Sequence, residues 1–442
     1  MTHVDGSLAR SFGGFIARSR QAGDLVVQPR IGMSNPGTMR AGLLATKGAA
    51  ATTVGTITLD SYTRMGFDDK ARAALDSGVE LNGYPIVAHD VATTRAVLDG
   101  AMGPVFPVQV RHGSPCPEQL FKALMAAGLH ATEGGPVSYC LPYSRAPLGE
   151  SIRNWERCTE MLAGLRGTGV EPHLESFGGC MLGQLCPPSL LIAMSVLECM
   201  FFRQHGIRSV SLSYAQQTNP DQDREAILAL QRLADELLPD VDSHIVVYAY
   251  MGVYPRTIHG ATNLLVEAAR LAVRTGASRL IVKTTAEAHW IPTIADNVSA
   301  LETAAAAAAA EPRMPADDVD TGIYAEARTL IDAVTSLSDD LGQALAAAFR
   351  LGYLDIPYCL HPDNAGRTRS YIDSAGRLNW SRVGSMPIRA TDRATGSVDL
   401  TAAQLLTSLS YVERKFDDAS LPQWLAMPDE PAGRARELKE AK

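Results

Sequence analysis

Three arginines stand at or just beyond the ends of short β-branched runs in the first part of the sequence. Arg30 ends the triplet Gln-Pro-Arg, Arg64 ends Tyr-Thr-Arg, and Arg111 begins Arg-His-Gly. A guanidinium group is a planar fork that binds a carboxylate through two hydrogen bonds, so three of them around one cavity suit a small dicarboxylate better than a neutral substrate. A single loop arginine is about as often only solvated or salt-bridged. The prediction therefore depends on a fold that brings all three together.

A glutamate and two tyrosines follow the fourth run. The sequence from Thr132 reads Thr-Glu-Gly-Gly-Pro-Val-Ser-Tyr-Cys-Leu-Pro-Tyr. Glu133 can accept a hydrogen bond from a substrate ammonium group, and the paired glycines after it allow the backbone to approach closely. Tyr139 and Tyr143 offer an apolar wall with a polar tip, although tyrosines at such positions are more often core or rim residues than ligands.

The eighth run leads into Lys-Thr-Thr-Ala-Glu, which places Lys283 and Glu287 four residues apart at a strand-to-helix junction. That spacing can point both side chains into the same cavity at the carboxyl end of the strand. A lysine at the end of a barrel strand also fits a Schiff-base aldolase, and the residues alone leave this alternative open. His112, His130 and His289 are dispersed, and the seven cysteines lack the paired short spacings of a zinc site. We therefore predict no metal site on this chain.

Eight β-branched runs alternate with amphipathic helical stretches through the first two-thirds of the chain. This rhythm predicts βα units with a parallel sheet, and eight of them make a (β/α)8 TIM-type barrel, whose active site lies at the carboxyl ends of the strands. A doubly wound sheet is the main competitor, but no Gly-rich phosphate fingerprint follows the first strand. The predicted strands are Leu25–Arg30, Thr53–Leu59, Val105–Arg111, His130–Glu133, Pro172–Phe177, Ser209–Tyr214, His244–Tyr250 and Arg279–Lys283.

An additional C-terminal helical segment is predicted after the barrel. The run Ala304–Ala310 is a strong helix former, a second helical stretch extends from about Gly322 to Leu351, and the Pro- and Asn-bearing stretch Asp355–Gly366 indicates a functional loop or domain edge. We expect an N-terminal arm at 1–24, the barrel at 25–310, a C-terminal helical and loop region packed on the barrel at 311–427, and a flexible tail at 428–442.

The overall composition is that of a soluble globular protein. Of 442 residues, 46% are hydrophobic and 20% charged, and the net charge is −8. No basic stripe is present, which argues against nucleic-acid binding. We find neither a signal peptide nor an apolar stretch long enough to span a bilayer, so we predict no membrane association and a cytoplasmic location.

Taken in order, these motifs resemble those of the glutamate mutase (methylaspartate mutase) epsilon, or E, subunit. The resemblance runs from about Val26 to Gly366 and includes QPR, YTR, LNGYP, VRHG, EGG with SYxxPY, FG followed by PPS, IVKTxxEAxxIPT, and DIP with NAG. It implies an adenosylcobalamin-dependent carbon-skeleton mutase. Such an enzyme interconverts (S)-glutamate and (2S,3S)-3-methylaspartate through radicals that follow cobalt–carbon homolysis.

The resemblance also implies roles for individual residues. We expect Glu133, Arg64 and Arg111 to act in catalysis. By position, Arg30, Arg64 and Arg111 match the family's substrate-binding arginines, Glu133, Tyr139 and Tyr143 match residues lining the amino-acid pocket, and Asn82, Lys283 and Glu287 match residues around the adenosyl group.

A partner subunit is implied as well. The resemblance suggests a homodimer of this chain capped by two small sigma subunits, which carry most of the contacts to cobalamin and its cobalt. Carriers of this class contain Asp-x-His-x-x-Gly, whereas the nearest approach here, Asp242–Val247, lacks the glycine. The chain also departs from the family at the end of the seventh strand, where Tyr248-Ala249-Tyr250 replaces His-Gln-Trp.

Two further interpretations stay open. The first keeps the fold and cofactor but changes the substrate to another small dicarboxylic acid, such as a 2-oxo analogue of glutamate; the absence of an ammonium partner near Glu133 would favour it. The second is a catalytically silent binding or scaffold protein that retains the pocket. The intact arginines and the Lys283/Glu287 pair count against that second interpretation.

Overall fold

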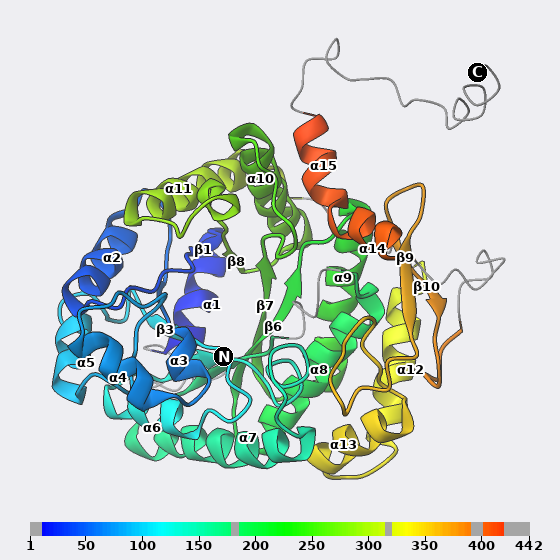
Figure 1. Ribbon diagram of the computed structural model, residues 1–442, viewed down its shortest axis with the longest axis horizontal. Helices are drawn as coiled ribbons and strands as arrows, with labels where there is room; N and C mark the ends of the chain where they lie inside the picture. Colours follow the sequence, from blue (N-terminus) through cyan, green and yellow to red (C-terminus); the bar gives the residue numbers. More distant parts are fainter. Residues whose placement is uncertain (1–10, 178–184, 314–320, 390–400, 420–442) are drawn as a thin grey trace, which may run out of the picture.

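A barrel of eight parallel strands forms the centre of the computed structural model, which describes residues 11–177, 185–313, 321–389 and 401–419 (Figure 1). The sheet order is β1-β8-β7-β6-β5-β4-β3-β2, so neighbours in sequence are neighbours in space. The predicted (β/α)8 TIM-type barrel and all eight of its strands are confirmed. The strands are β1 Val26–Gln28, β2 Gly55–Thr58, β3 Val108–Arg111, β4 Ala131–Glu133, β5 His173–Glu175, β6 Ser209–Ala215, β7 Asp242–Tyr248 and β8 Arg279–Ile281.

The barrel closes where β1 meets β2, at a seam made by few contacts. An isolated parallel bridge joins Val27 to Thr53, and the Val27 N–H donates to the Thr52 carbonyl at 3.0 Å. Further along, the Thr58 N–H donates to the Ile31 carbonyl at 2.8 Å. All other neighbouring strands in the described barrel pair directly in the sheet, whereas β1 and β2 are joined only by these isolated contacts.

The barrel helices begin at side-chain caps that the sequence supplies. Asn35 caps α2, Asp90 caps α5 and Asn219 caps α9, each by accepting a hydrogen bond from a backbone N–H three residues on. The outer helices are α2 Pro36–Gly48, α3 Ser61–Arg64, α4 Asp68–Asp76, α5 Val91–Leu98, α6 Glu118–Ala126, α7 Leu148–Ala163 with the 3-10 turn η2 Gly164–Thr168, α8 Pro188–Gln204, α9 Pro220–Leu237, α10 Ile258–Thr275, the 3-10 turn η5 Thr285–Ala288, and α11 Ile294–Ala310.

Helix α1 (Phe12–Ala22) packs against the amino-terminal ends of the strands, within the segment expected to be an arm. Phe12 lies in an apolar cluster with Val26, Val54 and Ala131, and its ring stacks on His173 at 4.9 Å between centroids. The helix therefore covers the end of the barrel opposite the mouth. Residues 1–10 of the expected arm lie outside the described residues.

A second layer of helices covers α8 on one side of the barrel. Helix α12 (Ile323–Thr335) packs on α8 and α9, and α13 (Leu341–Leu351) packs on α7 and α8. This arrangement explains why α8 is apolar all round. The single stretch expected from Gly322 to Leu351 is thus two helices, because Asp340 caps a new helix by accepting from the Gln343 N–H.

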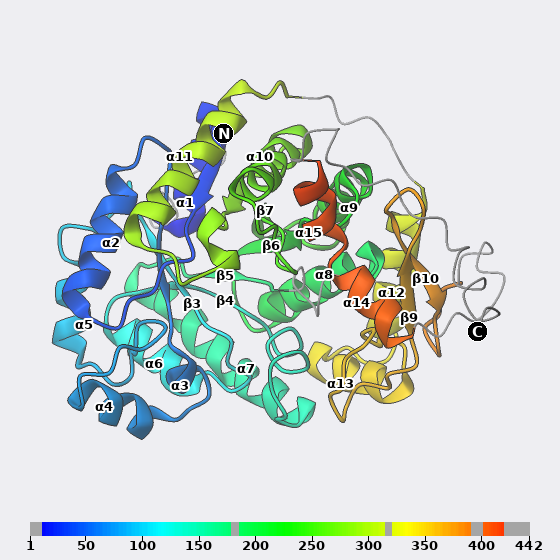
Figure 2. The ribbon, with the colours of Figure 1, turned by 45° about the horizontal axis from the view of Figure 1, so that its top comes forward.

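The C-terminal region also contains a hairpin that the sequence did not lead us to predict. Strands β9 (Arg369–Ile372) and β10 (Leu378–Arg382) pair antiparallel on the same side as α12 and α13 (Figure 2). Helices α14 (Ala402–Leu409) and α15 (Tyr411–Asp418) follow, and α15 packs on α10. The expected tail at 428–442 lies outside the described residues. No helix in the described ranges is long and apolar enough to cross a membrane.

Candidate active site at the barrel mouth

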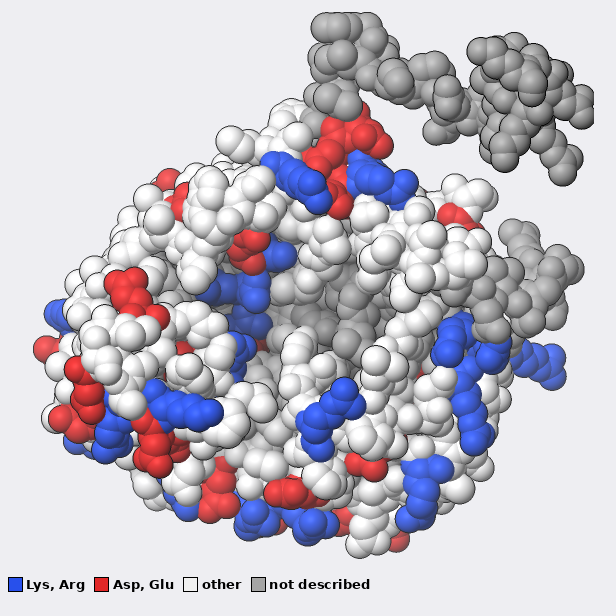
Figure 3. Space-filling view, in the orientation of Figure 1, with Lys and Arg blue, Asp and Glu red and all other residues white. Residues whose placement is uncertain are grey.

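The carboxyl ends of the strands surround a cavity of about 330 Å³. Viewed down the barrel, the surface is hollowed at its centre, and Lys and Arg side chains gather along one wall of the hollow (Figure 3). A cavity of this volume lies at the small end of ligand pockets, which run from roughly 300 to 1,000 Å³. Its lining comprises Arg30, Thr58, Ser61, Arg64, Met65, Arg111, His112, Gly113, Glu133, Tyr139, Tyr143 and Phe177.

Arg111 and Glu133 form a buried ion pair at the base of this cavity. The distance from Arg111 Nε to Glu133 Oε2 is 2.6 Å, and their side chains are only 6% and 1% exposed. Burial opposes the charge on Arg111, but the Glu133 carboxylate outweighs it and the pKa of Arg111 lies above its usual value. Burial raises the pKa of Glu133, with Arg111 opposing the rise and Glu175 adding to it. The second oxygen of Glu133 accepts a hydrogen bond from the Tyr139 hydroxyl.

The two glycines after Glu133 are required by close packing. Gly134 has φ +126°, and a Cβ there would lie 2.5 Å from the Tyr139 ring and 2.6 Å from Trp155. A Cβ on Gly135 would lie 2.1 Å from the carboxyl group of Glu198. The glycine pair therefore lets the turn that carries Tyr139 lie directly on its neighbours.

Glu198 on α8 holds this turn and was missed from the sequence. It accepts hydrogen bonds from the Val137 N–H at 3.1 Å, the Ser138 N–H at 2.9 Å and the Ser138 hydroxyl at 2.8 Å. Burial raises its pKa to about 7, although these donors lower it. A glutamate in an apolar helix is the one signal in the sequence that marks it as an unusual buried carboxyl.

His112 lines the cavity as well, although from the sequence we weighed it only as a metal ligand. Its ring stacks on Trp155 at 5.8 Å and meets Tyr139 edge-on. The Ser114 N–H donates to Nδ1 at 3.2 Å, which places the ring proton on Nε2. Burial and nearby Arg64 lower the pKa of His112 to about 3, so the ring is neutral at physiological pH. In the described ranges, His, Cys, Asp and Glu side chains form no group of three suited to a metal.

Arg64 lies on α3, just beyond β2, and is linked to Asn82 through Ser61. Arg64 Nη2 donates to the Ser61 hydroxyl at 2.9 Å, and Asn82 Nδ2 donates to the same hydroxyl at 2.7 Å. Gly83 brings Asn82 to this place, because a Cβ on Gly83 would lie 2.5 Å from the Leu59 backbone. The structure thus places exposed Asn82 beside the arginine wall.

Arg30, Lys283 and Glu287 form one cluster on the β1–β8 side of the mouth. The distance from Glu287 Oε2 to Arg30 Nη1 is 2.7 Å, and to Lys283 Nζ it is 3.7 Å. The Lys283 ammonium lies 4.3 Å from the centre of the Tyr254 ring. The four-residue spacing therefore does bring Lys283 and Glu287 together. In this structure Lys283 is engaged in an ion pair with Glu287.

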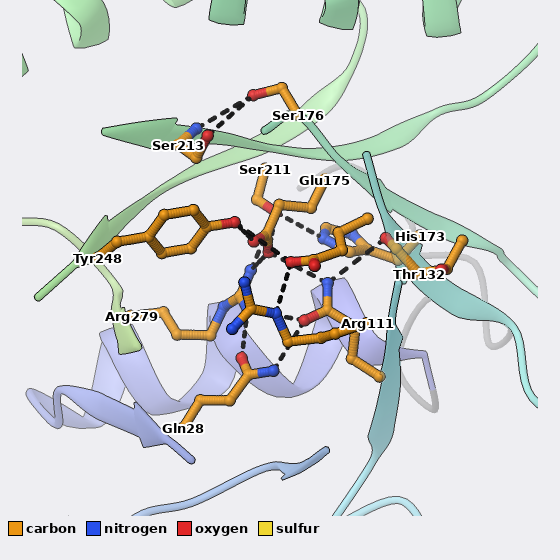
Figure 4. A network of polar contacts seen from close by, with 12 residues as sticks. Gln28, Arg111, Thr132, His173, Glu175, Ser176, Ser211, Ser213, Tyr248 and Arg279 are labelled. Atoms are coloured by element: carbon orange, nitrogen blue, oxygen red, sulfur yellow. Dashed lines mark hydrogen bonds and ion pairs between the residues drawn. The ribbon is translucent and has the colours of Figure 1, made fainter. Parts of the chain in front are cut away.

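A second polar layer lies below the cavity, inside the barrel, and was not foreseen (Figure 4). Arg279 and Glu175 form an ion pair with both side chains fully buried. Arg279 also donates to Gln28, and Gln109 Nε2 donates to Glu175 Oε2 at 3.1 Å. Ser211 donates to the same oxygen at 3.0 Å. Figure 4 shows the side chains of Gln28, Glu175, Ser211 and Arg279 pointing toward one another from different strands.

Comparisons with known proteins identify the family of the chain. The model of the methylaspartate mutase E chain family matches residues 8–402. The glutamate mutase epsilon subunit of Halobacterium salinarum is 34% identical over 345 residues, which cover 75% of this chain and 71% of that protein. The subunit of the same name from Escherichia coli O157:H7 is 30% identical over 349 residues, covering 75% and 72%. The chain therefore belongs to the methylaspartate mutase E chain family.

Proposed function

We propose that the chain is the catalytic subunit of an adenosylcobalamin-dependent mutase that interconverts (S)-glutamate and (2S,3S)-3-methylaspartate by a radical mechanism. The observation that carries the proposal is a cavity of about 330 Å³ lined by three arginines and one buried carboxylate. That lining complements a molecule with two carboxylates and one ammonium group.

The arginines would hold the substrate by its two carboxylates. Arg111 contacts Glu133 through Nε, and its terminal nitrogens can turn to a substrate carboxylate. Arg64 and Arg30 are half-buried or exposed at the rim, where a second carboxylate can reach them. A radical fragment held by charge-assisted hydrogen bonds in a buried cavity is kept from solvent and from escape.

Glu133 would accept the hydrogen bond from the substrate ammonium group. Its carboxylate lines the cavity, so an acceptor for an amino group is present. This favours an amino acid over the 2-oxo analogue that the sequence left open. His112 is neutral beside it and adds no positive charge against the ammonium.

Asn82, Lys283 and Glu287 would hold the adenosyl group. Glu287 offers carboxylate oxygens to ribose hydroxyls, and Lys283 and Asn82 offer N–H donors, so the donor set at the rim fits a nucleoside. Adenosylcobalamin would supply a carbon radical by homolysis of its cobalt–carbon bond. We propose that the cobalt is carried mainly by a separate sigma subunit with the Asp-x-His-x-x-Gly motif, and that this chain forms a homodimer.

The test is reconstitution. We expect the purified chain with adenosylcobalamin and (S)-glutamate to form no 3-methylaspartate until a small cobalamin-binding subunit with that motif is added. Full activity of the isolated chain would refute the two-subunit proposal. Turnover of 2-oxoglutarate but not of glutamate, measured in parallel, would refute the assignment of the substrate.

A further inference from the structure

Tyr248, at the end of β7, lies between two buried carboxyl groups. Its hydroxyl donates a hydrogen bond to Glu175 Oε1 (Figure 4). Glu133 Oε2 lies 3.4 Å from the same hydroxyl. The Arg111 guanidinium lies over the Tyr248 ring, with its central carbon 5.2 Å from the centre of the ring. The side chain is fully buried. Tyr248 therefore connects the inner polar layer to the wall of the substrate cavity.

A phenol has one proton, so it can serve only one of these carboxylates at a time. The Tyr248 hydroxyl donates its proton to Glu175, because its contact with Glu175 is the shorter of the two. The ion pair with Arg279 also fixes the Glu175 carboxylate in place. Burial acts to raise the pKa of Glu175, but Arg279 and Arg111 outweigh it and hold the pKa below its usual value. Glu175 is thus the charged member of the inner layer, and Tyr248 stands between that charge and Glu133.

We propose that Tyr248 is a positioning residue for the substrate amino group: its hydroxyl ties Glu175 into the inner layer and leaves Glu133 to Arg111, Tyr139 and the substrate ammonium. The proposal rests on the proposed function, since it takes Glu133 as the ammonium partner. A neutral phenol donates one proton, so it can hold Glu175 while it leaves Glu133 to its other partners.

Removal of the hydroxyl has a defined electrostatic result. Glu175 would lose one donor and keep Arg279, Gln109 and Ser211, so its charge would face Glu133 with less compensation. A neighbouring carboxylate that is less well compensated raises the pKa of Glu133 and favours its neutral form. A rise of one pKa unit lowers the ionised fraction about tenfold at pH values below that pKa.

Other groups around Glu133 stay the same in such a variant. Apart from Tyr248, the charged or titratable groups that face it or share its cavity are Arg111 and His112 from β3 and its loop, Tyr139 and Tyr143 from the loop after β4, Glu175 from β5, Arg64 from α3, Arg30 from the loop after β1 with its ion-pair partner Glu287, and Lys283, which also pairs with Glu287.

The experiment compares two ligands that differ only in the amino group. Calorimetry would measure the binding of (S)-glutamate and of glutarate to the chain reconstituted with its cobalamin-binding partner, between pH 6 and pH 9. For Tyr248→Phe we expect the preference for glutamate over glutarate to fall, by up to about tenfold for each unit by which the pKa of Glu133 rises, and to recover as the pH is raised. Glutarate affinity should change little.

Tyr214→Phe is the matched control. Tyr214 is a buried phenol on β6 that donates to a buried carboxylate, Asp223, at 2.8 Å and lies outside the cavity lining. This control should leave the preference unchanged. Equal weakening of both ligands by Tyr248→Phe, or a loss that does not depend on pH, would overturn the positioning role and leave the proposed function intact. A wild type without any preference for glutamate would instead overturn the role of Glu133, and the proposal with it.

Discussion

Replacement of Glu198 by glutamine should make the stability of the protein less dependent on pH. Glu198 is fully buried on α8 and accepts three hydrogen bonds from the turn that carries Tyr139. Burial raises its pKa from 4.5 to about 7. Glutamine has nearly the same shape and can still accept from the backbone N–H groups, while the Ser138 hydroxyl can turn to accept from its amide.

The sign follows from the raised pKa. Between pH 4.5 and about 7, Glu198 binds a proton in the folded protein but not in the unfolded protein. The unfolding free energy of wild type therefore falls as the pH rises through this range. At about 1.4 kcal/mol per pKa unit, the loss is about 3 kcal/mol of unfolding free energy. The glutamine variant has no such titration. Its stability relative to wild type should therefore improve by about 3 kcal/mol across this range.

Urea denaturation of both proteins at several pH values from 4.5 to 8 would measure this difference directly. Comparison of the two proteins cancels the titration of all other groups. The matched control is Glu80→Gln, which changes an exposed carboxylate after α4 and should alter the free energy of unfolding by less than about 0.5 kcal/mol. If the difference between Glu198→Gln and wild type did not depend on pH, the carboxyl would not be the buried, neutral group that we describe.

Three further predictions concern the mouth. Arg64→Lys and Arg111→Lys keep the charge but lose the planar fork, so kcat/KM for glutamate in the reconstituted enzyme should fall by an amount that corresponds to about 2–5 kcal/mol, whereas solvated arginines would change it by less than about 1 kcal/mol. Glu287→Gln should weaken productive cofactor binding and slow hydrogen abstraction more than it raises KM; an unchanged cob(II)alamin signal with unchanged turnover would contradict this role. Gly135→Ala puts a Cβ 2.1 Å from a buried carboxyl group and should lower stability by about 1–3 kcal/mol in urea denaturation, whereas Gly103→Ala, with no atom within 4 Å of its Cβ, should be near neutral.

Much of the barrel could be predicted from the sequence because the buried parallel strands appear as short apolar runs, and an amphipathic helical pattern follows them. Strands β6 and β8, for example, begin at the residues expected, Ser209 and Arg279. The places of Arg30, Arg64 and Arg111 followed from the same pattern, since the carboxyl ends of the strands meet at one mouth. The roles proposed for these arginines stay predictions.

Residues whose partners are far away in sequence could not be placed in this manner. Glu175 and Arg279 lie 104 residues apart and pair across the barrel interior, and no local spacing indicates their contact. Glu198 serves a turn some 60 residues earlier. His112 sat in a recognised motif, but its packing on Trp155 needed the fold. For Glu175, Arg279 and Glu198, the available signal was a charged residue inside an apolar strand or helix.

The light seam between β1 and β2 has a consequence for motion. Arg30 follows β1 and Arg64 follows β2, so the two guanidinium groups stand on opposite sides of the join formed at Val27 and Thr53. Local opening is easiest where few backbone hydrogen bonds must break. A dicarboxylate bound to both arginines would connect the two sides of this seam. Substrate binding would therefore oppose local opening of the barrel between β1 and β2. Slower amide exchange at the seam would then report an occupied pocket.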